Sequence, residues 1–97
     1  MNWPQVAKDL LAISEWPWKA RIEEQDLPEI TDRNTWAVAN VYGTDEDADF
    51  IAAAPRLLAE ALVEAVEADP DCPDRIRLKS LGISPEDYAE IKRRLGE

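Results

Sequence analysis

The stretch "DEDADFIAAAPRLLAEALVEAVE" at residues 45–67 decides the fold, because its apolar residues keep helical spacing on both sides of a proline. Successive apolar positions lie 3, 4, 3 and 4 residues apart: Ile51, Ala54, Leu58, Ala61 and Ala65. A helix that began independently at Pro55 would have no reason to keep this phase. We therefore favour one helix over 45–67, kinked or loosened near Ile51, whose carbonyl loses its partner. The alternative is a break at Ala54, with Pro55 opening a second helix.

The helix 45–67 carries two apolar faces. The first is the spaced set above, widened by Phe50, Leu57 and Leu62, and we expect it to pack on a sheet. The second consists of small residues that allow close approach of another element: Ala52, Ala59, Val63 and Val66. We expect the second face to pack on a helix, either the chain's own terminal helix or one from a second copy in a homodimer.

The segment before this helix predicts a small antiparallel sheet. In residues 16–22 apolar and polar side chains alternate with period two, which is typical of a half-buried strand, and Pro17 belongs at its start or edge. The segment "LPEITDRN" at 27–34 predicts a weak second strand, and "TWAVANVYG" at 35–43 predicts a third. Three strands with short links suggest a meander.

Helices are predicted at both ends of the chain. Asn2 can cap a helix over 3–14, and Thr44 can cap the long helix, whose first turn is acidic. Residues 75–81 alternate as in a strand, but the glycine at 82 favours a short helix there. The final helix, within 84–96, begins at Ser84 and has three basic residues in its last turn.

These patterns predict one α+β domain over residues 1–97. We expect a sheet of about three strands packed against the long helix, with short helices added at both ends. The sheet and long helix form the core at 16–66, and 73–96 form a helical extension. A length of 97 residues fits a single domain, and the apolar fraction of 45% is sufficient for a modest core.

The net charge of −10 is unevenly distributed. Residues 1–74 hold 17 acidic and 5 basic groups, whereas residues 75–97 hold 4 acidic and 6 basic groups. The acidic part would repel phosphate, which argues against nucleic-acid binding there. An acidic body favours solubility and basic partners: a solvated surface is the default interpretation, and a surface that meets a basic protein is the alternative. No apolar run is long enough to span a bilayer, so we expect no membrane association.

Few side chains for catalysis or metal binding are present. The chain has no histidine and one cysteine, Cys72, which excludes histidine-dependent nucleophilic triads and the usual zinc clusters. Its three isolated glycines form no phosphate-binding loop. We therefore expect no enzyme activity and no cofactor. A single cysteine also suits a reducing cytosol.

The acidic run at 45–49 was tested as a cation site. Asp45, Asp47 and Asp49 alternate as at the start of an EF-hand loop, but the required sixth-position glycine is Phe50 and the twelfth-position glutamate is Arg56. Helix capping is the better interpretation of the run.

Three sets of residues are candidate interaction surfaces. The first combines the acidic run with two tryptophans that either pack in the core or, where exposed, bind a partner: Asp45, Glu46, Asp47, Asp49, Trp16 and Trp18. The second is basic and could contact nucleic acid or an acidic protein, or else complement helix ends and the acidic body: Arg75, Arg77, Lys79, Lys92, Arg93 and Arg94. The third is the small-residue face of the long helix described above.

The order of these parts resembles a family of small proteins encoded by tailed bacteriophages and prophages. Pro17-Trp18 stands near the start of the expected sheet, and the helix matches the family's Ala-x-x-Ile-Ala-Ala-Ala-Pro-x-Leu-Leu pattern over Ala48–Leu58. The resemblance covers about residues 16–66, and the terminal helices depart from the family's short form. It implies a phage gene product in the cytoplasm of a bacterial host, with no catalytic residues to carry over.

The leading functional hypothesis is a small acidic binding protein that modulates a host protein by direct contact. One alternative is a DNA-associated regulator that uses the basic carboxy-terminal helices. A third hypothesis is a homo-oligomeric accessory protein.

Overall fold

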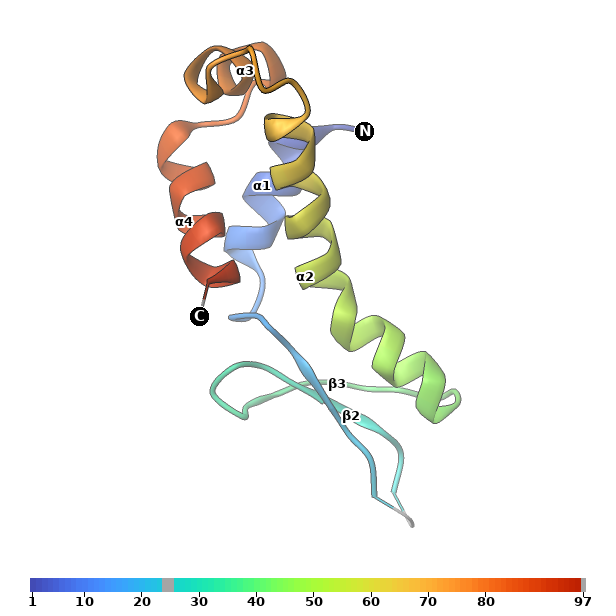
Figure 1. Ribbon diagram of the computed structural model, residues 1–97. Coiled ribbons are helices and arrows are strands. Elements are labelled where there is room, and N and C mark those ends of the chain that lie inside the picture. Colours follow the sequence, from blue (N-terminus) through green and yellow to red (C-terminus); the bar gives the residue numbers. More distant parts are fainter. Residues whose placement is uncertain (24–25, 97) are drawn as a thin grey trace. The chain divides into compact units, whose positions relative to one another are not determined.

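A computed structural model describes residues 1–23 and 26–96, which form four helices and three strands (Figure 1). In chain order the elements are α1 (Trp3–Ala12), β1 (Lys19–Arg21), β2 (Glu29–Thr31), β3 (Ala37–Asn40), α2 (Asp45–Glu67), α3 (Asp74–Leu81) and α4 (Pro85–Leu95). The predicted α+β fold is confirmed: a three-strand antiparallel sheet packs against the long helix α2, with one helix before and two after.

The chain divides into two compact units, which are described separately. The sheet unit comprises Ser14–Arg56, and the helical unit comprises Met1–Ile13 with Leu57–Glu97. The boundary lies within α2, so each unit contains part of that helix. The sequence-based division into one domain, with a core at 16–66 and an extension at 73–96, stays a prediction.

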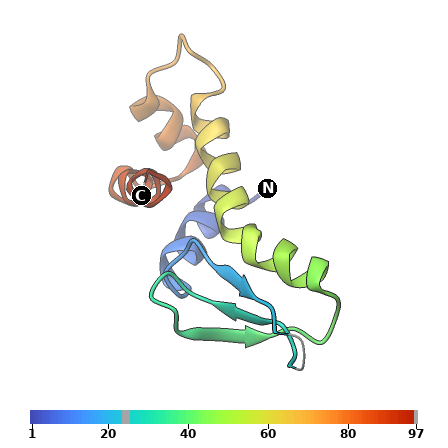
Figure 2. The ribbon, with the colours of Figure 1, turned by 60° about the horizontal axis from the view of Figure 1, so that its bottom comes forward.

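The sheet of the sheet unit is a meander in the order β1-β2-β3 (Figure 2). Ala20 lies opposite Ile30, and Ile30 lies opposite Ala39, so β2 is central and β1 and β3 are the edges. A register shift between Ile30 and Thr31 interrupts the second pairing. The strands are shorter than the alternation predicted, because Trp16 and Ile22 both lie outside β1. The Trp16–Pro17 peptide bond, just before β1, is cis.

The core of the sheet unit is small and joins the sheet to the first half of α2. It is formed by Ile30, Val41, Ala48 and Ala52, with Trp18, Ala20 and Val38 packed around it. The sheet supplies the large side chains and α2 supplies alanines, which let the helix approach the sheet closely.

The prediction of one helix over 45–67 in place of two is confirmed, with Pro55 inside it, and the kink near Ile51 stays a prediction. The start of α2 is held by a reciprocal cap. The Thr44 hydroxyl accepts from the Asp47 amide at 3.1 Å, and the Asp47 carboxylate accepts from the Thr44 amide at 3.0 Å. Capping is thus the observed role of Asp47.

The prediction of which face of α2 is buried is wrong by one residue. The buried positions are Ala48, Ala52, Pro55, Ala59, Leu62 and Val66. Each of the last five follows one residue of the spaced set that was expected to face the sheet. Ile51 and Leu58 are instead 43% and 38% exposed. The two faces of α2 share the same alternating spacing of three and four residues. The buried face is the one with the alanines Ala48, Ala52 and Ala59, whose short side chains allow closer packing.

The small-residue face therefore packs within the chain. Ala52, Ala59 and Val66 are buried and Val63 is half-buried, so these side chains are not presented to a second copy. Of the two alternatives for this face, packing within the chain applies to Ala52, Ala59 and Val66, and a homodimer stays a prediction.

The helical unit contains α1, the second half of α2, α3 and α4, and α1 packs against α4. The Asn2 side chain caps α1 by accepting from the Gln5 amide. The buried apolar residues of this unit come from every helix: Ala7, Leu10, Ala59, Leu62, Val66, Leu78, Ile83, Tyr88 and Ile91.

The ambiguous residues 75–81 are helical, as favoured, and lie in α3. Gly82 ends α3 in the left-handed conformation with φ of 78°, and its amide donates to the carbonyls of Leu78 and Lys79. Ser84 stands at the cap position of α4 as predicted, but its hydroxyl donates to the Glu86 carboxylate at 2.6 Å, which lowers the pKa of Glu86.

Candidate functional site

Acidic side chains gather at one end of the sheet unit. Because the sheet is antiparallel, the end of β1, the start of β2 and the end of β3 lie at the same end of the sheet, and α2 begins five residues after β3 (Figure 1). We call this region the acidic end. Its described carboxylates are Glu23, Asp26, Glu29, Asp45, Glu46, Asp47 and Asp49.

The carboxylates of the acidic end are mostly available to a partner. Asp47 is engaged in the helix cap, and Glu23 pairs with Arg21 at 2.7 Å. Asp45, Glu46 and Asp49 are exposed and form no ion pair with any residue in 1–23 or 26–96. Asp45 and Glu46, in the first turn, stabilise the start of α2 through the helix dipole while facing solvent.

Large apolar side chains are exposed in the same region. Tyr42 is 86% exposed just before the turn into α2, and Phe50, in the second turn of α2, is 75% exposed. Ile22 and Leu27, on either side of the β1–β2 connection, are 45% and 47% exposed. Leu27 also lines a hollow of about 360 Å³ together with Arg21, Glu23, Asp26, Glu29 and Asn40. The acidic end therefore combines apolar anchors with a negative rim.

The tryptophans are distributed differently from the prediction. Trp16 is only 1% exposed, so of its two predicted interpretations core packing applies, and the ring is not exposed for contact with a partner. Trp18 is half-buried, and its indole N–H donates to the Ser14 carbonyl at 3.0 Å. Trp36 is 74% exposed in the turn before β3, at the opposite end of the sheet from Tyr42.

The sequence patterns do not identify Tyr42 and Phe50 as candidate interaction residues. They place Phe50 in the apolar stripe expected to face the sheet and Tyr42 in a strand that in fact ends at Asn40. The sequence feature that could have identified both aromatics as surface residues is their position close to Gly43 and the acidic run.

A second hollow lies beside β1. It has a volume of about 520 Å³ and runs between the segment Pro17–Ala20 and one flank of α2, where its lining residues are Asp49, Ala52, Ala53 and Arg56. We call it the β1 groove. Trp18, the other tryptophan predicted to contact a partner, lies in its wall.

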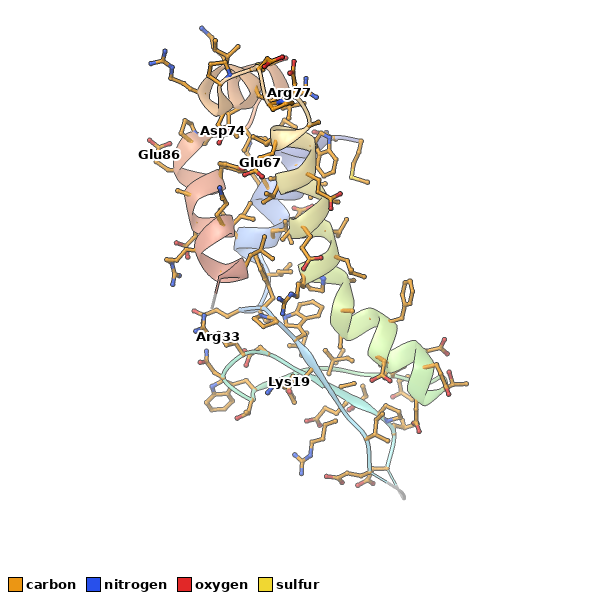
Figure 3. All side chains as sticks on the ribbon, viewed as in Figure 1. Lys19, Arg33, Glu67, Asp74, Arg77 and Glu86 are labelled. Carbon is orange, nitrogen blue, oxygen red and sulfur yellow. The ribbon has the colours of Figure 1, made fainter. Side chains whose placement is uncertain are left out.

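The basic carboxy-terminal residues are largely engaged within the helical unit. Arg77 (Figure 3) donates to the Ala65 carbonyl in the last turns of α2 at 3.2 Å. Arg94 donates to the Leu10 carbonyl at 3.3 Å. Arg93 and Arg94 both bond to Glu90, and the Arg93 contact is chiefly responsible for lowering the pKa of Glu90 to about 2.

Lys92 bridges to the end of α2. Its ammonium lies 3.1 Å from the Glu67 carboxylate, and the Tyr88 hydroxyl donates to the same carboxylate at 3.2 Å. The Lys92 bond and then the Tyr88 bond lower the pKa of Glu67, while burial and then Glu67 raise the pKa of Tyr88. Among the six basic residues, only Arg75 and Lys79 have side chains that make no polar contact with a described residue.

The described part of the chain contains no cluster of three acidic or cysteine side chains placed to hold a metal ion. Within the run at 45–49, Asp47 forms the cap of α2 with Thr44. Within residues 1–23 and 26–96, no helix has the length and apolar character that crossing a bilayer requires.

Comparisons of this chain with protein-family models, with curated proteins and with solved structures found no match.

Proposed function

We propose that this chain is a phage- or prophage-encoded binding protein that acts on a host protein in the bacterial cytoplasm, and that it has no catalytic role. The observation that carries the proposal is the acidic end, where exposed Tyr42 and Phe50 lie near Asp45, Glu46 and Asp49, which form no ion pair within the described chain. Aromatic side chains of this exposure are the residues that most often dominate binding energy at protein interfaces.

The two kinds of side chain have separate tasks. The carboxylates steer a basic partner surface toward the acidic end and raise the association rate, an effect that salt screens. The aromatic rings lose their exposed surface on contact and set the dissociation rate. This division predicts an interaction that weakens with salt and is lost when the rings are removed.

The phage origin rests on the resemblance of Asp47–Leu62 to the helix of phage-encoded proteins. A host target is an inference by analogy from the size and acidity of such gene products. The acidic end would meet a basic protein surface, including one that otherwise binds nucleic acid.

The experiment is quantitative affinity capture from bacterial lysate with tagged full-length chain, at low and moderate salt. We compare the wild type with the double variant Tyr42→Ala/Phe50→Ala and with Trp36→Ala, which removes an equally exposed aromatic from the other end of the sheet. The proposal expects a basic protein that the wild type and Trp36→Ala retain and the double variant loses. Equal retention by all three chains would refute it.

The alternatives have less support. Four of the six basic residues proposed for DNA contact already bond to carboxylates or helix-end carbonyls: Arg77, Lys92, Arg93 and Arg94. The small-residue face that would join a homo-oligomer is inside the chain.

A further inference from the structure

The outer side of α3 carries two cations that form no ion pair with a described residue. Arg75 and Lys79 are exposed, and neither side chain makes a polar contact with the described chain. They lie one turn apart on the same side of the helix, because they are four residues apart. Ile76, which is 54% exposed, adds an apolar side chain beside them. We call Arg75, Ile76 and Lys79 the basic face.

The one carboxylate of α3 lies on the other side of that helix. Asp74 is four residues from Leu78, which is buried, so it shares the inner side with Leu78. Burial is the main cause of the raised pKa of Tyr88 in α4, and the charge of Asp74 adds to it, so Asp74 lies toward α4. Asp69 and Asp71 precede α3 in a loop, where the Asp69 carboxylate accepts from the Asp71 amide at 3.0 Å. The cations of the basic face therefore share it with no carboxylate of α3.

The acidic end of a second copy has the complementary charge and character. Its exposed carboxylates Asp45, Glu46 and Asp49 form no ion pair within the described chain. Tyr42 and Phe50, which are 86% and 75% exposed, lie near them in the sequence. The basic face and the acidic end are thus two surfaces of the same chain that each combine apolar side chains with charges of opposite sign.

The spacing of the charges also matches. Asp45 and Asp49 are four residues apart in the first turns of α2, as the two cations are in α3, so both pairs are separated by about 6 Å along their helix axes. If the two helices run antiparallel, Asp49 of one copy lies opposite Arg75 of the other. Asp45 then lies opposite Lys79, and both cations are paired.

We propose that the basic face binds the acidic end of a second copy of this chain, with α3 of one copy antiparallel to the start of α2 of the other. This arrangement brings Phe50 beside Ile76, because each follows a paired residue by one position. The contact is head-to-tail, since its two surfaces differ. Neither surface is the small-residue face of α2.

The inference deepens the proposed function, because a second copy bound at the acidic end would compete with the host protein there. Only this competition rests on the proposed function. Association of two copies needs no host protein, and it is measured on the purified chain alone.

The net charge of −10 opposes association of two copies, and salt separates this repulsion from the contact. At about 0.1 M salt, charges farther apart than about 10 Å are largely screened, whereas ion pairs in contact still attract. At about 1 M salt the screening length is about 3 Å, and the pairs themselves weaken. We therefore expect association at the lower salt concentration and a weaker association at the higher one.

The experiment is sedimentation velocity of the full chain from micromolar to millimolar concentration. One variant removes the cations, Arg75→Gln/Lys79→Gln, and the other removes the carboxylates, Asp45→Asn/Asp49→Asn. Each should weaken association by about tenfold, which is the scale of two exposed ion pairs. The carboxylate variant also has less net charge than the wild type, so a loss of general repulsion would strengthen its association instead. Circular dichroism confirms that both variants fold.

A mixture of the two variants tests the head-to-tail geometry. Each variant lacks a different surface, so a mixture retains one intact contact, between the acidic end of the cation variant and the basic face of the carboxylate variant. We expect the mixture to form dimers at concentrations where each variant alone is a monomer. The control Lys8→Gln/Lys19→Gln removes two exposed cations outside the basic face and should associate like the wild type.

Four results would overturn the proposal. These are a wild type that stays monomeric at millimolar concentration and about 0.1 M salt, association that strengthens as salt is added, association that both contact variants retain, and a mixture that forms no dimer. None of these results involves a host protein, so failure of self-association and failure of host capture are distinguishable.

Discussion

Two leucines of α2, one turn apart, should differ sharply in their contribution to stability. Leu62 is fully buried in the helical unit, whereas Leu58 remains 38% exposed. Both leucines are replaced by alanine. The two variants therefore have the same substitution in the same helix and the same compact unit, and they differ in burial. The stripe predicted from sequence places Leu58 on the buried face and Leu62 only beside it; the structure reverses their order.

The magnitude follows from burial. Truncation of Leu62 removes its transfer free energy and leaves a cavity, which together cost about 3 kcal/mol of unfolding free energy. Leu58 is partly in water already, and its truncation encloses no cavity. Burying a whole leucine side chain stabilises a protein by about 1.5–3 kcal/mol, and Leu58 is 38% exposed, so Leu58→Ala should cost about 1–2 kcal/mol.

The assay is urea unfolding of each variant, followed by circular dichroism at helical wavelengths. Unchanged slopes would show that the denaturation midpoints report stability. In thermal unfolding, a loss of 3 kcal/mol corresponds to a drop in Tm of at least about 12 °C for a chain of this size. A Leu58→Ala variant as unstable as Leu62→Ala would refute the assignment of the buried face.

Three further perturbations test local features of the fold. Thr44→Ala removes the side-chain half of the α2 cap and should cost about 1 kcal/mol in urea unfolding, whereas Thr44→Ser should cost little. Gly82→Ala places a Cβ at φ of 78°, so we expect a loss of about 1 kcal/mol, and Gly82→Asn should lose less because asparagine tolerates that conformation. Folding lowers the pKa of Glu90 from its ordinary 4.5 to about 2, so the ionised side chain contributes to stability above pH 4.5 and loses that contribution as the pH falls toward 2. Glu90→Gln should therefore flatten the acid side of the curve of Tm against pH. An unchanged curve would contradict the contact between Arg93 and Glu90.

Local features of the fold were predictable because their causes lie within a few residues. The caps at Asn2 and Thr44, the stop at Gly82 and the continuity of α2 through Pro55 all follow from short-range chemistry. The strand alternation located the sheet, although it overestimated strand lengths.

The rotation of α2 was not predictable in the same way. Its two apolar faces have identical spacing and differ by one residue, so periodicity could not rank them. Side-chain size decided the outcome: Ile30 and Val41 fill the space above the sheet and leave room for Ala48 and Ala52, while bulkier Phe50 and Ile51 stay exposed. That choice depends on tertiary packing and also determines which aromatics reach the surface.

The candidate site was predicted in part for a related reason. The acidic run was visible in the sequence, but its neighbours across the sheet end, Ile22 and Leu27, are brought there by strand pairing. For Trp16 the sequence left core packing and partner binding both open, because alternation indicates which side chains share a face and not how deeply each is buried.

The most direct test of the binding proposal is photo-crosslinking in living bacteria. A benzoylphenylalanine replaces Tyr42 at the acidic end in one chain and Trp36 at the other end of the sheet in a second chain. The account predicts a discrete adduct with a host protein from position 42 and none from position 36. An adduct from position 36 alone, or none from either position, would contradict it.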